Sequence, residues 1–492
     1  MLATIETRAL VGLEGWRVDV EVDVANGLPG FHVVGLPGTA VRESCDRVRS
    51  ALRNAGFDYP LKRITVNLAP ADIRKVGPHF DLPIALGILI ASGQLAPRRR
   101  AVAIGELALD GRTRAVRGAL CMACSVPKGQ SLLVAAASAG EAQEAGGVIV
   151  PAPDVRSAAA WLAGGEAGRS PAADAPTPEP ATSADLADVK GQPFARRALE
   201  IAAAGGHGLL MVGPPGVGKT MLARRLPGIL PGLTAEERLE IRRIHSVAGL
   251  LAEGAAPPVR PFRAPHHACT RAALIGDAAR LAPGEASLAH GGVLFLDEMA
   301  EFRAEAIEAL RQPLERGAVT LSRGGLRVAF PARFMLVAAT NPCPCGRYGE
   351  PDESCRCTHA ELARYRRRFS AAILDRIDLV VGLSRPDEAD WFAAAGAEGS
   401  RAVRARVEAA RARQYARQGD GVGNAALGVD ALRTHAAMDE GAAALLRDAL
   451  RRLHLSGRSL DRLIKVARTI ADLEGQPTVG AAQLAEALQY RA

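Results

Sequence analysis

An octapeptide near the middle of the chain, Gly-Pro-Pro-Gly-Val-Gly-Lys-Thr, has the residue types and spacing of a phosphate-binding loop. Its glycines, Gly213, Gly216 and Gly218, allow backbone N–H groups to surround an anion without a β-carbon in the way. Lys219 is expected to neutralise the outer phosphates of a nucleotide, and the Thr220 hydroxyl to occupy one coordination position on Mg²⁺. The spacing therefore predicts binding of ATP with magnesium.

Such a loop needs a strand before it and a helix after it to act as an anion site. The apolar run Leu209–Val212 precedes it, and a helix-like segment begins at Thr220. A second apolar run, Gly292–Leu296, ends in two carboxylates. Asp297 is expected in the Mg²⁺ shell, and Glu298 is expected to polarise the attacking water.

A third apolar run, Phe334–Ala339, leads to Asn341. Because ligands gather at the carboxyl ends of parallel strands, Asn341 is expected to orient the water or to sense the γ-phosphate. The alternative is a turn-forming asparagine before Pro342. These strands predict a parallel-sheet α/β core.

Four of the eight cysteines lie in one short window, as the pairs Cys343/Cys345 and Cys355/Cys357. In a reducing compartment, two Cys-X-Cys pairs favour a structural Zn²⁺ site with four thiolates. The competing interpretation is four ordinary thiols in a flexible loop, since Cys-X-X-Cys is the more usual zinc spacing.

The composition is that of a globular protein with 492 residues, 48% hydrophobic and 23% charged, long enough for about three domains. Its formal net charge of +8 is compatible with binding a polyanion. Aromatic residues make up only 4%, which argues against a single-strand binder that works mainly by base stacking. The sequence shows no signal-peptide pattern and no apolar run of membrane-spanning length, so we expect a soluble, cytoplasmic protein without a membrane partner.

Composition also divides the chain into four parts. Residues 1–165 alternate in strand fashion around a helical segment, which predicts an α+β domain. Residues 166–187 are rich in Pro, Ala and Ser and predict an extended linker. Residues 188–386 hold the α/β core, and residues 387–492 have the helical spacing of an all-α domain.

Longer segments around these motifs carry a family resemblance. They begin at Arg260 (Arg-Pro-Phe-Arg-Ala-Pro-His-His), Pro283 (Pro-Gly-Glu-Ala-Ser-Leu-Ala-His), Leu310 (Leu-Arg-Gln-Pro-Leu-Glu) and Asn341 (Asn-Pro-Cys-Pro-Cys-Gly). With them the chain resembles, over essentially its full length, the magnesium-chelatase-like AAA+ proteins of the ComM/YifB type. The resemblance implies a Lon-protease-like N-terminal domain, an ATPase core and a C-terminal helical lid.

The resemblance also implies roles for residues outside the first motifs. Arg376, in Leu-Asp-Arg-Ile-Asp, looks like the arginine finger that reaches the γ-phosphate bound by a neighbouring subunit. The alternative is a local pair with a flanking aspartate. Arg458 is similar to the lid's second sensor, expected on the γ-phosphate of its own chain, with Arg462 as its rival. Gly191 and Gln192 lie where the family holds the nucleotide base.

The N-terminal domain departs from the active Lon protease that it resembles. Lon carries its nucleophile as a serine in a Gly-Pro-Ser context, whereas this chain has Gly77, Pro78 and His79. The partner lysine is expected shortly after Gly118, where the sequence reads Ala-Leu-Cys-Met-Ala-Cys. Without a serine and its lysine base, no nucleophile is activated, so we predict no peptidase activity.

The segment from residue 317 to 330 predicts a hairpin, because two alternating strands flank Arg-Gly-Gly. Its placement is similar to the pore hairpin of the MCM replicative helicases, in which a basic residue grips the phosphate backbone. Arg323 and Arg327 are therefore candidate DNA contacts, with a solvated turn arginine as the alternative. A segment that resembles the second loop of that helicase branch supplies further candidates: Arg260, Arg263, His266, His267 and Arg271.

Together these features predict a homo-hexameric AAA+ ATPase that binds ATP and Mg²⁺ between subunits and moves single-stranded and branched DNA. The ComM-type resemblance implies branch migration in recombination, for example during natural transformation. The alternatives are a protein-remodelling motor and a metal-chelatase-type motor subunit, neither of which would act on DNA.

Overall fold

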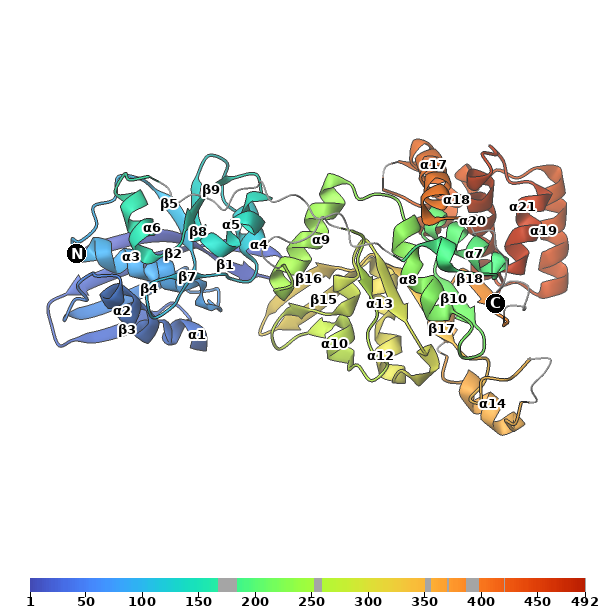
Figure 1. The fold of residues 1–492 in the computed structure, drawn as a ribbon, viewed down its shortest axis with the longest axis horizontal. Coiled ribbons are helices and arrows are strands. Elements are labelled where there is room, and N and C mark those ends of the chain that lie inside the picture. Colours follow the sequence, from blue (N-terminus) through green and yellow to red (C-terminus); the bar gives the residue numbers. More distant parts are fainter. Residues whose placement is uncertain are drawn as a thin grey trace.

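The computed structural model describes residues 1–166, 184–251, 259–349, 355–369, 371–385, 398–419 and 421–491. Figure 1 shows three successive parts along the longest axis, with the N-terminal part at the left in blue and the C-terminal helices at the right in red. Most of the predicted linker, 166–187, lies outside the described residues. Its end does not: Leu186 is 1% exposed and packs in the core of the central part, which therefore begins before residue 188.

The N-terminal part is built on a seven-stranded sheet with the order β3-β4-β2-β1-β5-β8-β9. The β2 strand runs antiparallel to both of its neighbours, and the other pairs are parallel. The strands are β1 (Leu2–Val11), β2 (Glu14–Ala25), β3 (Gly30–Val34), β4 (Arg63–Ala69), β5 (Ala101–Ile104), β8 (Ser131–Ala135) and β9 (Val148–Ala152), with a separate hairpin of β6 (Glu106–Leu107) and β7 (Thr113–Arg114).

Helices cover this sheet: α1 (Thr39–Arg42), α2 (Ser44–Asn54), α3 (Asp81–Ala91), α4 (Ala119–Cys124), α5 (Ala136–Gln143) and α6 (Val155–Leu162), with a 3₁₀ turn at Pro78–Phe80. Every residue of α3 is buried; its first residue, Asp81, pairs with Arg47, and the rest of its sequence is apolar on all sides, as full burial requires. Alternate residues of β2 from Val18 to Val24 are buried, as the strand pattern predicts.

The central part confirms the predicted parallel-sheet core. Its strand order is β11-β14-β17-β10-β18, and all four neighbouring pairs are parallel. The strands are β10 (Leu209–Val212), β11 (Phe262–Arg263), β14 (Val293–Leu296), β17 (Met335–Thr340) and β18 (Leu379–Gly382). Since the strands are parallel, the segments that follow them gather at one edge of the sheet and the segments that precede them gather at the other.

Helices and two small hairpins surround this sheet. The helices are α7 (Pro193–Gly205), α8 (Lys219–Ile229), α9 (Ala235–Ala248), α10 (Arg271–Ile275), α11 (Glu285–Leu288), α12 (Ala304–Ala309), α13 (Arg311–Arg316), α14 (His359–Arg366) and α15 (Ala371–Leu374), with 3₁₀ turns at Leu186–Asp188 and Met299–Glu301. The hairpins are β12 (Gly276–Asp277) with β13 (Ala282–Pro283), and β15 (Ala318–Arg323) with β16 (Leu326–Pro331).

Within the described residues 398–419 and 421–491, the C-terminal part contains helices and only one isolated β-bridge, Met438 with Val479. The helices are α17 (Ser400–Gln418), α18 (Val429–His435), α19 (Glu440–Leu453), α20 (Gly457–Leu473) and α21 (Ala481–Gln489), with a 3₁₀ turn at Asn424–Ala426. Their apolar faces join one face of the central sheet in a single hydrophobic core. Across the described ranges, no helix is both long and apolar enough to cross a membrane.

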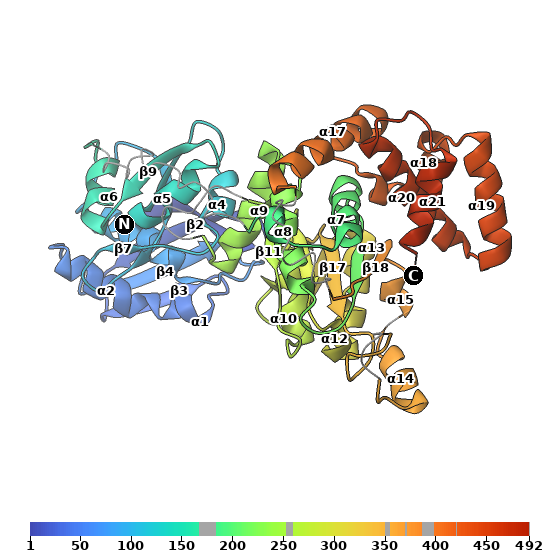
Figure 2. The same ribbon diagram turned by 45° about the vertical axis from the view of Figure 1, so that its right-hand side comes forward.

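The N-terminal part packs against the central part through the β1–β2 turn and α4, and both views show α4 beside α9 (Figures 1 and 2). Leu13 and Cys121 belong to the same buried cluster as Ile244 of α9 and Val328 of β16. The backbone N–H of Gly118 donates to Ser246 O at 3.1 Å. The N-terminal part is therefore in direct contact with the hairpin that the sequence assigns to DNA.

Candidate nucleotide site

The predicted phosphate-binding loop joins β10 to α8, as its flanks require. Gly216 and Gly218 have φ angles of 83° and 93°, in the left-handed region that favours glycine. Lys219 Nζ donates to Gly213 O at 2.6 Å and to Asn341 Oδ1 at 3.1 Å. Burial lowers the pKa of Lys219, although two nearby carboxylates favour its charged form. The ammonium thus lies inside the loop and is tied to the end of β17.

The two residues predicted to bind magnesium lie side by side. Thr220 Oγ1 donates to Asp297 Oδ2 at 2.7 Å. Two oxygens in adjacent positions of an octahedral Mg²⁺ shell lie about 3 Å apart, given metal–oxygen distances of about 2.1 Å. The hydroxyl and the carboxylate therefore fit one Mg²⁺ ion with little movement, and the remaining positions would be left to phosphate oxygens and water.

Glu298 follows directly and has a φ of 52°, a conformation that non-glycine residues seldom adopt outside functional sites. Its side chain is 57% exposed, and its Oε2 lies 3.5 Å from His267 Nδ1. The sequence suggested His267 as a DNA contact, and the structure places its ring against Glu298 instead. This carboxylate is free to face water at the mouth of the loop.

Asn341 has a partner that sequence reasoning missed. The Tyr365 hydroxyl, on α14, donates to Asn341 O at 3.1 Å and lies 3.0 Å from Thr340 Oγ1. Tyr365 is 7% exposed, so this contact is buried. No motif marks Tyr365, because only the fold returns α14 to the end of β17.

Gly191 and Gln192 lie at the start of α7. Gln192 has a φ of 57°, and its Nε2 donates to Ser384 O at 2.5 Å, just beyond the end of β18. The role of Gly191 and Gln192 beside the nucleotide base stays a prediction.

A cavity of about 1420 Å³ lies at the opposite edge of the sheet, among segments that precede β10, β14, β17 and β18. Arg376, Arg458 and Arg462 line it together. Arg376 pairs with Glu315 of α13. The cavity is therefore rich in guanidinium groups at the edge that holds no phosphate-binding loop.

Arg458 does not lie where we expected it. It was expected on the γ-phosphate of its own chain, but it lies 3.8 Å from Asp375, in the turn before β18. The reason is the position of α20: Arg462, one helical turn further, donates to Leu374 O at 3.0 Å and Ile377 O at 2.9 Å and so holds the start of α20 at this edge. The four residues of β10 alone separate the two edges by about 13 Å. Of the two candidates for the second sensor, the Arg458 side chain is 75% exposed, whereas the Arg462 guanidinium already donates hydrogen bonds to two backbone carbonyl groups.

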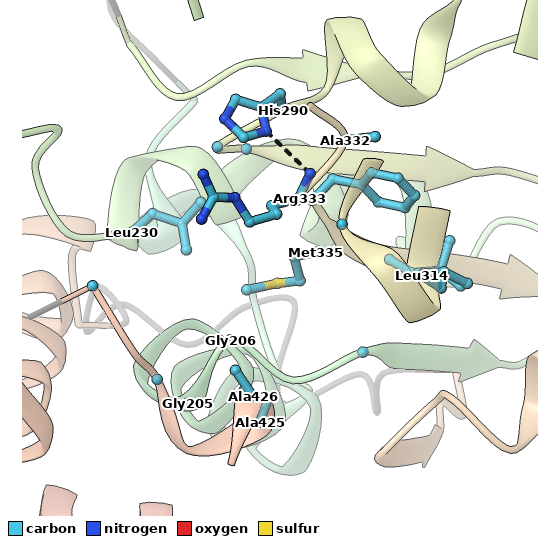
Figure 3. A pocket seen from close by; sticks show the side chains of 18 of the residues that line it. Gly205, Gly206, Leu230, His290, Leu314, Ala332, Arg333, Met335, Ala425 and Ala426 are labelled. Carbon is cyan, nitrogen blue, oxygen red and sulfur yellow. Dashed lines mark hydrogen bonds between the residues drawn. The ribbon is translucent and has the colours of Figure 1, made fainter. Parts of the chain in front are cut away.

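Figure 3 shows the inner wall of this cavity, with Gly205 and Gly206 facing Ala425 and Ala426 below a polar cluster. In that cluster the backbone N–H of Arg333 donates to His290 Nδ1 at 3.0 Å (Figure 3). His290 Nε2 lies 2.9 Å from Glu240, and this hydrogen bond lowers the pKa of the carboxyl group. The cluster fixes the start of β17 at the wall of the cavity.

Comparisons with known proteins agree with this architecture. Residues 185–391 match the family described as magnesium chelatase, subunit ChlI; residues 20–138 match subunit ChlI of Mg-chelatase, and residues 397–491 match its C-terminal family. The chain is 43% identical over 500 residues to the uncharacterized protein YifB of Escherichia coli, covering 100% of this chain and 97% of that protein. It is 42% identical over 501 residues to the competence protein ComM of Haemophilus influenzae, with the same coverage.

The chain belongs to the ComM/YifB-type magnesium-chelatase-like family. A further relative is the uncharacterized protein Rv2897c of Mycobacterium tuberculosis, 45% identical over 498 residues and covering 98% of this chain and 97% of that protein. Membership in this AAA+ family implies ATP and Mg²⁺ as cofactors, in agreement with the geometry around Thr220 and Asp297.

In this ComM/YifB-type chain, the four clustered cysteines meet in space. Their Sγ atoms all lie within 4.8 Å of one another. Backbone N–H groups, chiefly that of Arg347, lower the pKa of Cys345 to about 6. The arrangement is consistent with the predicted tetrathiolate metal site: Cys343, Cys345, Cys355 and Cys357.

The predicted hairpin is confirmed as β15–β16, and Gly324 and Gly325 both have positive φ angles, as a tight type I′ turn requires. Arg323 and Arg327 are exposed, and Arg323 donates to Ala279 O in the β12–β13 loop. The two hairpins therefore touch at their tips.

Two other arginines suggested as DNA contacts are engaged inside the fold. Arg263 forms two hydrogen bonds with Glu285, at 2.6 and 2.8 Å. Arg260 donates to Gly291 O at 2.6 Å and pairs with Glu237. Both hold β11 against its neighbours, and each already has a carboxylate partner; the suggested DNA contacts stay predictions.

His79, which the resemblance places at the position of the Lon nucleophile, is 4% exposed, and burial lowers its pKa to about 4. Its Nε2 has no hydrogen-bond partner within the described ranges. A buried, neutral imidazole of this kind has no route to a peptide substrate. The absence of peptidase activity remains a prediction.

Proposed function

We propose that this protein is an ATP hydrolase that assembles as a ring of identical subunits and uses hydrolysis to move DNA strands. The observation that carries this proposal is the separation of its chemistry between two edges of one sheet. Lys219, Asp297 and Glu298 lie at the carboxyl edge, and Arg376 and Arg458 lie at the amino edge. One copy cannot bring both sets to the same phosphate.

A head-to-tail arrangement of copies joins the two edges. Such an interface is heterologous, and it closes into a ring when the rotation between copies allows. Arg376 and Arg458 of one subunit then face the phosphates held by the next. We propose six subunits, as the family resemblance implies.

The reaction follows from the residues at the carboxyl edge. Lys219 and the loop amides hold the β- and γ-phosphates, and Thr220 and Asp297 hold the magnesium that neutralises them. Glu298 polarises the water, and Asn341, hydrogen-bonded to Lys219, positions it beside the γ-phosphate. The neighbour's Arg376 neutralises the charge that builds up in the transition state, an effect of about 10³- to 10⁵-fold in kcat.

The proposed substrate is DNA, because two hairpins with exposed arginines lie next to each other. A ring would bring one copy of Arg323 and Arg327 from each subunit towards a common channel, where they would hold the phosphate backbone without reading sequence. The name of the relative from Haemophilus influenzae, competence protein, supports a role in recombination during DNA uptake. We propose branch migration as the reaction.

The test is ATP hydrolysis by the full chain with no DNA and with single-stranded, duplex and four-way-junction DNA, at low and moderate salt. We expect stimulation that is strongest with junctions and decreases with salt. Arg323→Ala should keep the basal rate and lose the stimulation, whereas the control Arg433→Ala, on the exposed side of α18, should keep both. Hydrolysis that is indifferent to every DNA would favour the protein-remodelling or chelatase-type motor.

A further inference from the structure

The cysteine cluster lies directly beside the phosphate-binding loop, and the described residues join the two by several contacts. We propose that Cys343, Cys345, Cys355 and Cys357 hold one Zn²⁺ ion, and that this ion keeps Asn341 and the phosphate-binding loop in the arrangement that binds nucleotide. The second half of this inference rests on the proposed ATPase function, and the first half does not.

The sulfur atoms have the spacing of a single tetrahedral ion. The Sγ of Cys343 lies 3.3 Å from that of Cys345 and 3.7 Å from that of Cys355, and the last two are 3.6 Å apart. Four thiolates at about 2.3 Å from one zinc lie about 3.8 Å from one another. A disulfide requires about 2.05 Å, and all eight cysteines are free thiols. The geometry thus fits a bound ion better than paired cysteines.

The ion would cross-link two segments that both end at the nucleotide site. The first segment runs from Asn341 at the end of β17 into Cys343 and Cys345. The second begins at Cys355 and leads into α14, where the Thr358 side chain caps the helix and Tyr365 returns to donate to Asn341 O at 3.1 Å. A tetrathiolate site therefore closes a loop whose two ends meet at Asn341.

The same loop touches the phosphate-binding loop itself. Gly346, directly after the first cysteine pair, has a φ of 77°, and a β-carbon there would come within 2.7 Å of Pro215 Cδ. Pro215 is the third residue of the Gly-Pro-Pro-Gly loop. On the other side, Asn341 Oδ1 accepts a hydrogen bond from Lys219 Nζ at 3.1 Å. The cysteine loop thus contacts the nucleotide loop from two directions.

Loss of the ion would leave Cys355 and α14 joined to the first segment only by the intervening chain and by the contacts of Tyr365 and Arg366, so we expect α14 to move more freely relative to Cys343. Asn341 would then lose the support of Tyr365, and Lys219 would lose a fixed acceptor. We expect nucleotide binding to weaken by about tenfold, the equivalent of one hydrogen bond to a charged group.

The experiment measures zinc and iron in the full chain purified without chelator, and then binding of a fluorescent ATP analogue with Mg²⁺. We expect about one zinc per chain. Zinc should be lost in Cys345→Ser and Cys357→Ser and kept in the control Cys124→Ser, an exposed cysteine of α4. Stripping zinc from the unmodified chain should weaken binding of the analogue about tenfold, and added zinc should restore it.

Each half of the inference has its own refutation. No zinc in the purified chain, or iron in its place, would overturn the metal site. Bound zinc whose removal leaves nucleotide affinity unchanged would overturn its link to the phosphate-binding loop. Zinc removal is carried out on the unmodified chain, so the effect of zinc on nucleotide affinity is measured even if a cysteine variant fails to fold. A zinc-loaded chain that binds no nucleotide would refute the proposed ATPase and leave the zinc site standing.

Discussion

Two inactive variants, Glu298→Gln and Arg376→Ala, are expected to restore ATP hydrolysis when they are mixed. The first keeps its arginine but lacks the carboxylate that we propose polarises water. The second keeps the carboxylate but lacks the arginine. If each catalytic site takes these groups from two neighbouring subunits, a ring that contains both variants has some complete sites.

The size of the recovery follows from the head-to-tail geometry. In an equal mixture, half of the subunits carry an intact carboxylate and half of their neighbours carry an intact arginine, so about one quarter of the sites are complete. Arg376→Ala alone should retain at most about one thousandth of the normal kcat. Mixing should therefore raise phosphate release by at least about 100-fold over that variant, up to about a quarter of the unmodified rate.

The assay measures phosphate release at constant total protein while the ratio of the two variants is varied. Capture of an untagged variant by a tagged one verifies that mixed assemblies form. Arg311→Ala is the matched control, because Arg311 also contacts Glu315, at 3.2 Å, but does not line the cavity. It should be active alone. Verified mixed assemblies that stay inactive at every ratio would refute the assignment of Arg376 to the neighbour's site.

Three further outcomes are expected. Thr220→Ala should raise the Mg²⁺ concentration needed for half-maximal hydrolysis several-fold, measured by magnesium titration at saturating ATP. Asp472→Ala removes the buried carboxylate that pairs with Arg468 and should lower the free energy of unfolding by about 3–5 kcal/mol, measured by thermal unfolding, whereas the surface control Asp448→Ala should change it little. His79 takes up a proton below about pH 6.5 when unfolded but only near pH 4 when folded, so stability falls as pH drops from 7 to 5; His79→Leu should remove about 2 kcal/mol of that loss in urea unfolding.

The core and the phosphate-binding loop were predictable because local sequence determines them. Apolar runs of four to six residues followed by glycine, carboxylate or asparagine encode both the strand and the edge at which its ligands lie. The turn at Gly324 and Gly325 is encoded in the same way, since few other residues adopt two positive φ angles in succession.

The sequence could not predict which residues are brought to the site by packing between helices that are distant in the chain. The motif around Arg458 identifies a residue type, but α20 packs against α7 and α17, and this packing carries the arginine to the edge opposite Lys219. Tyr365 reaches Asn341 only because α14 folds back, and no periodicity in the sequence marks it. The carboxylate partners of Arg260 and Arg263, Glu237 and Glu285, lie 23 and 22 residues away in the chain, and no local pattern predicts these pairs.

The contact between the N-terminal part and the β15–β16 hairpin limits how relatives in this family can exchange parts. Leu13 in the β1–β2 turn is 8% exposed because Val328 of β16 and α9 cover it. A chimera joined inside 166–187 would pack the β1–β2 turn of one relative against the β15–β16 hairpin of another. The apolar contact between Leu13 and Val328 would then be formed by side chains from different proteins. Functional chimeras should therefore carry residues 1–166 together with α9 and β15–β16 from the same parent. Among relatives, substitutions at Leu13 should be accompanied by substitutions at the residues of α9 and β16 that it contacts.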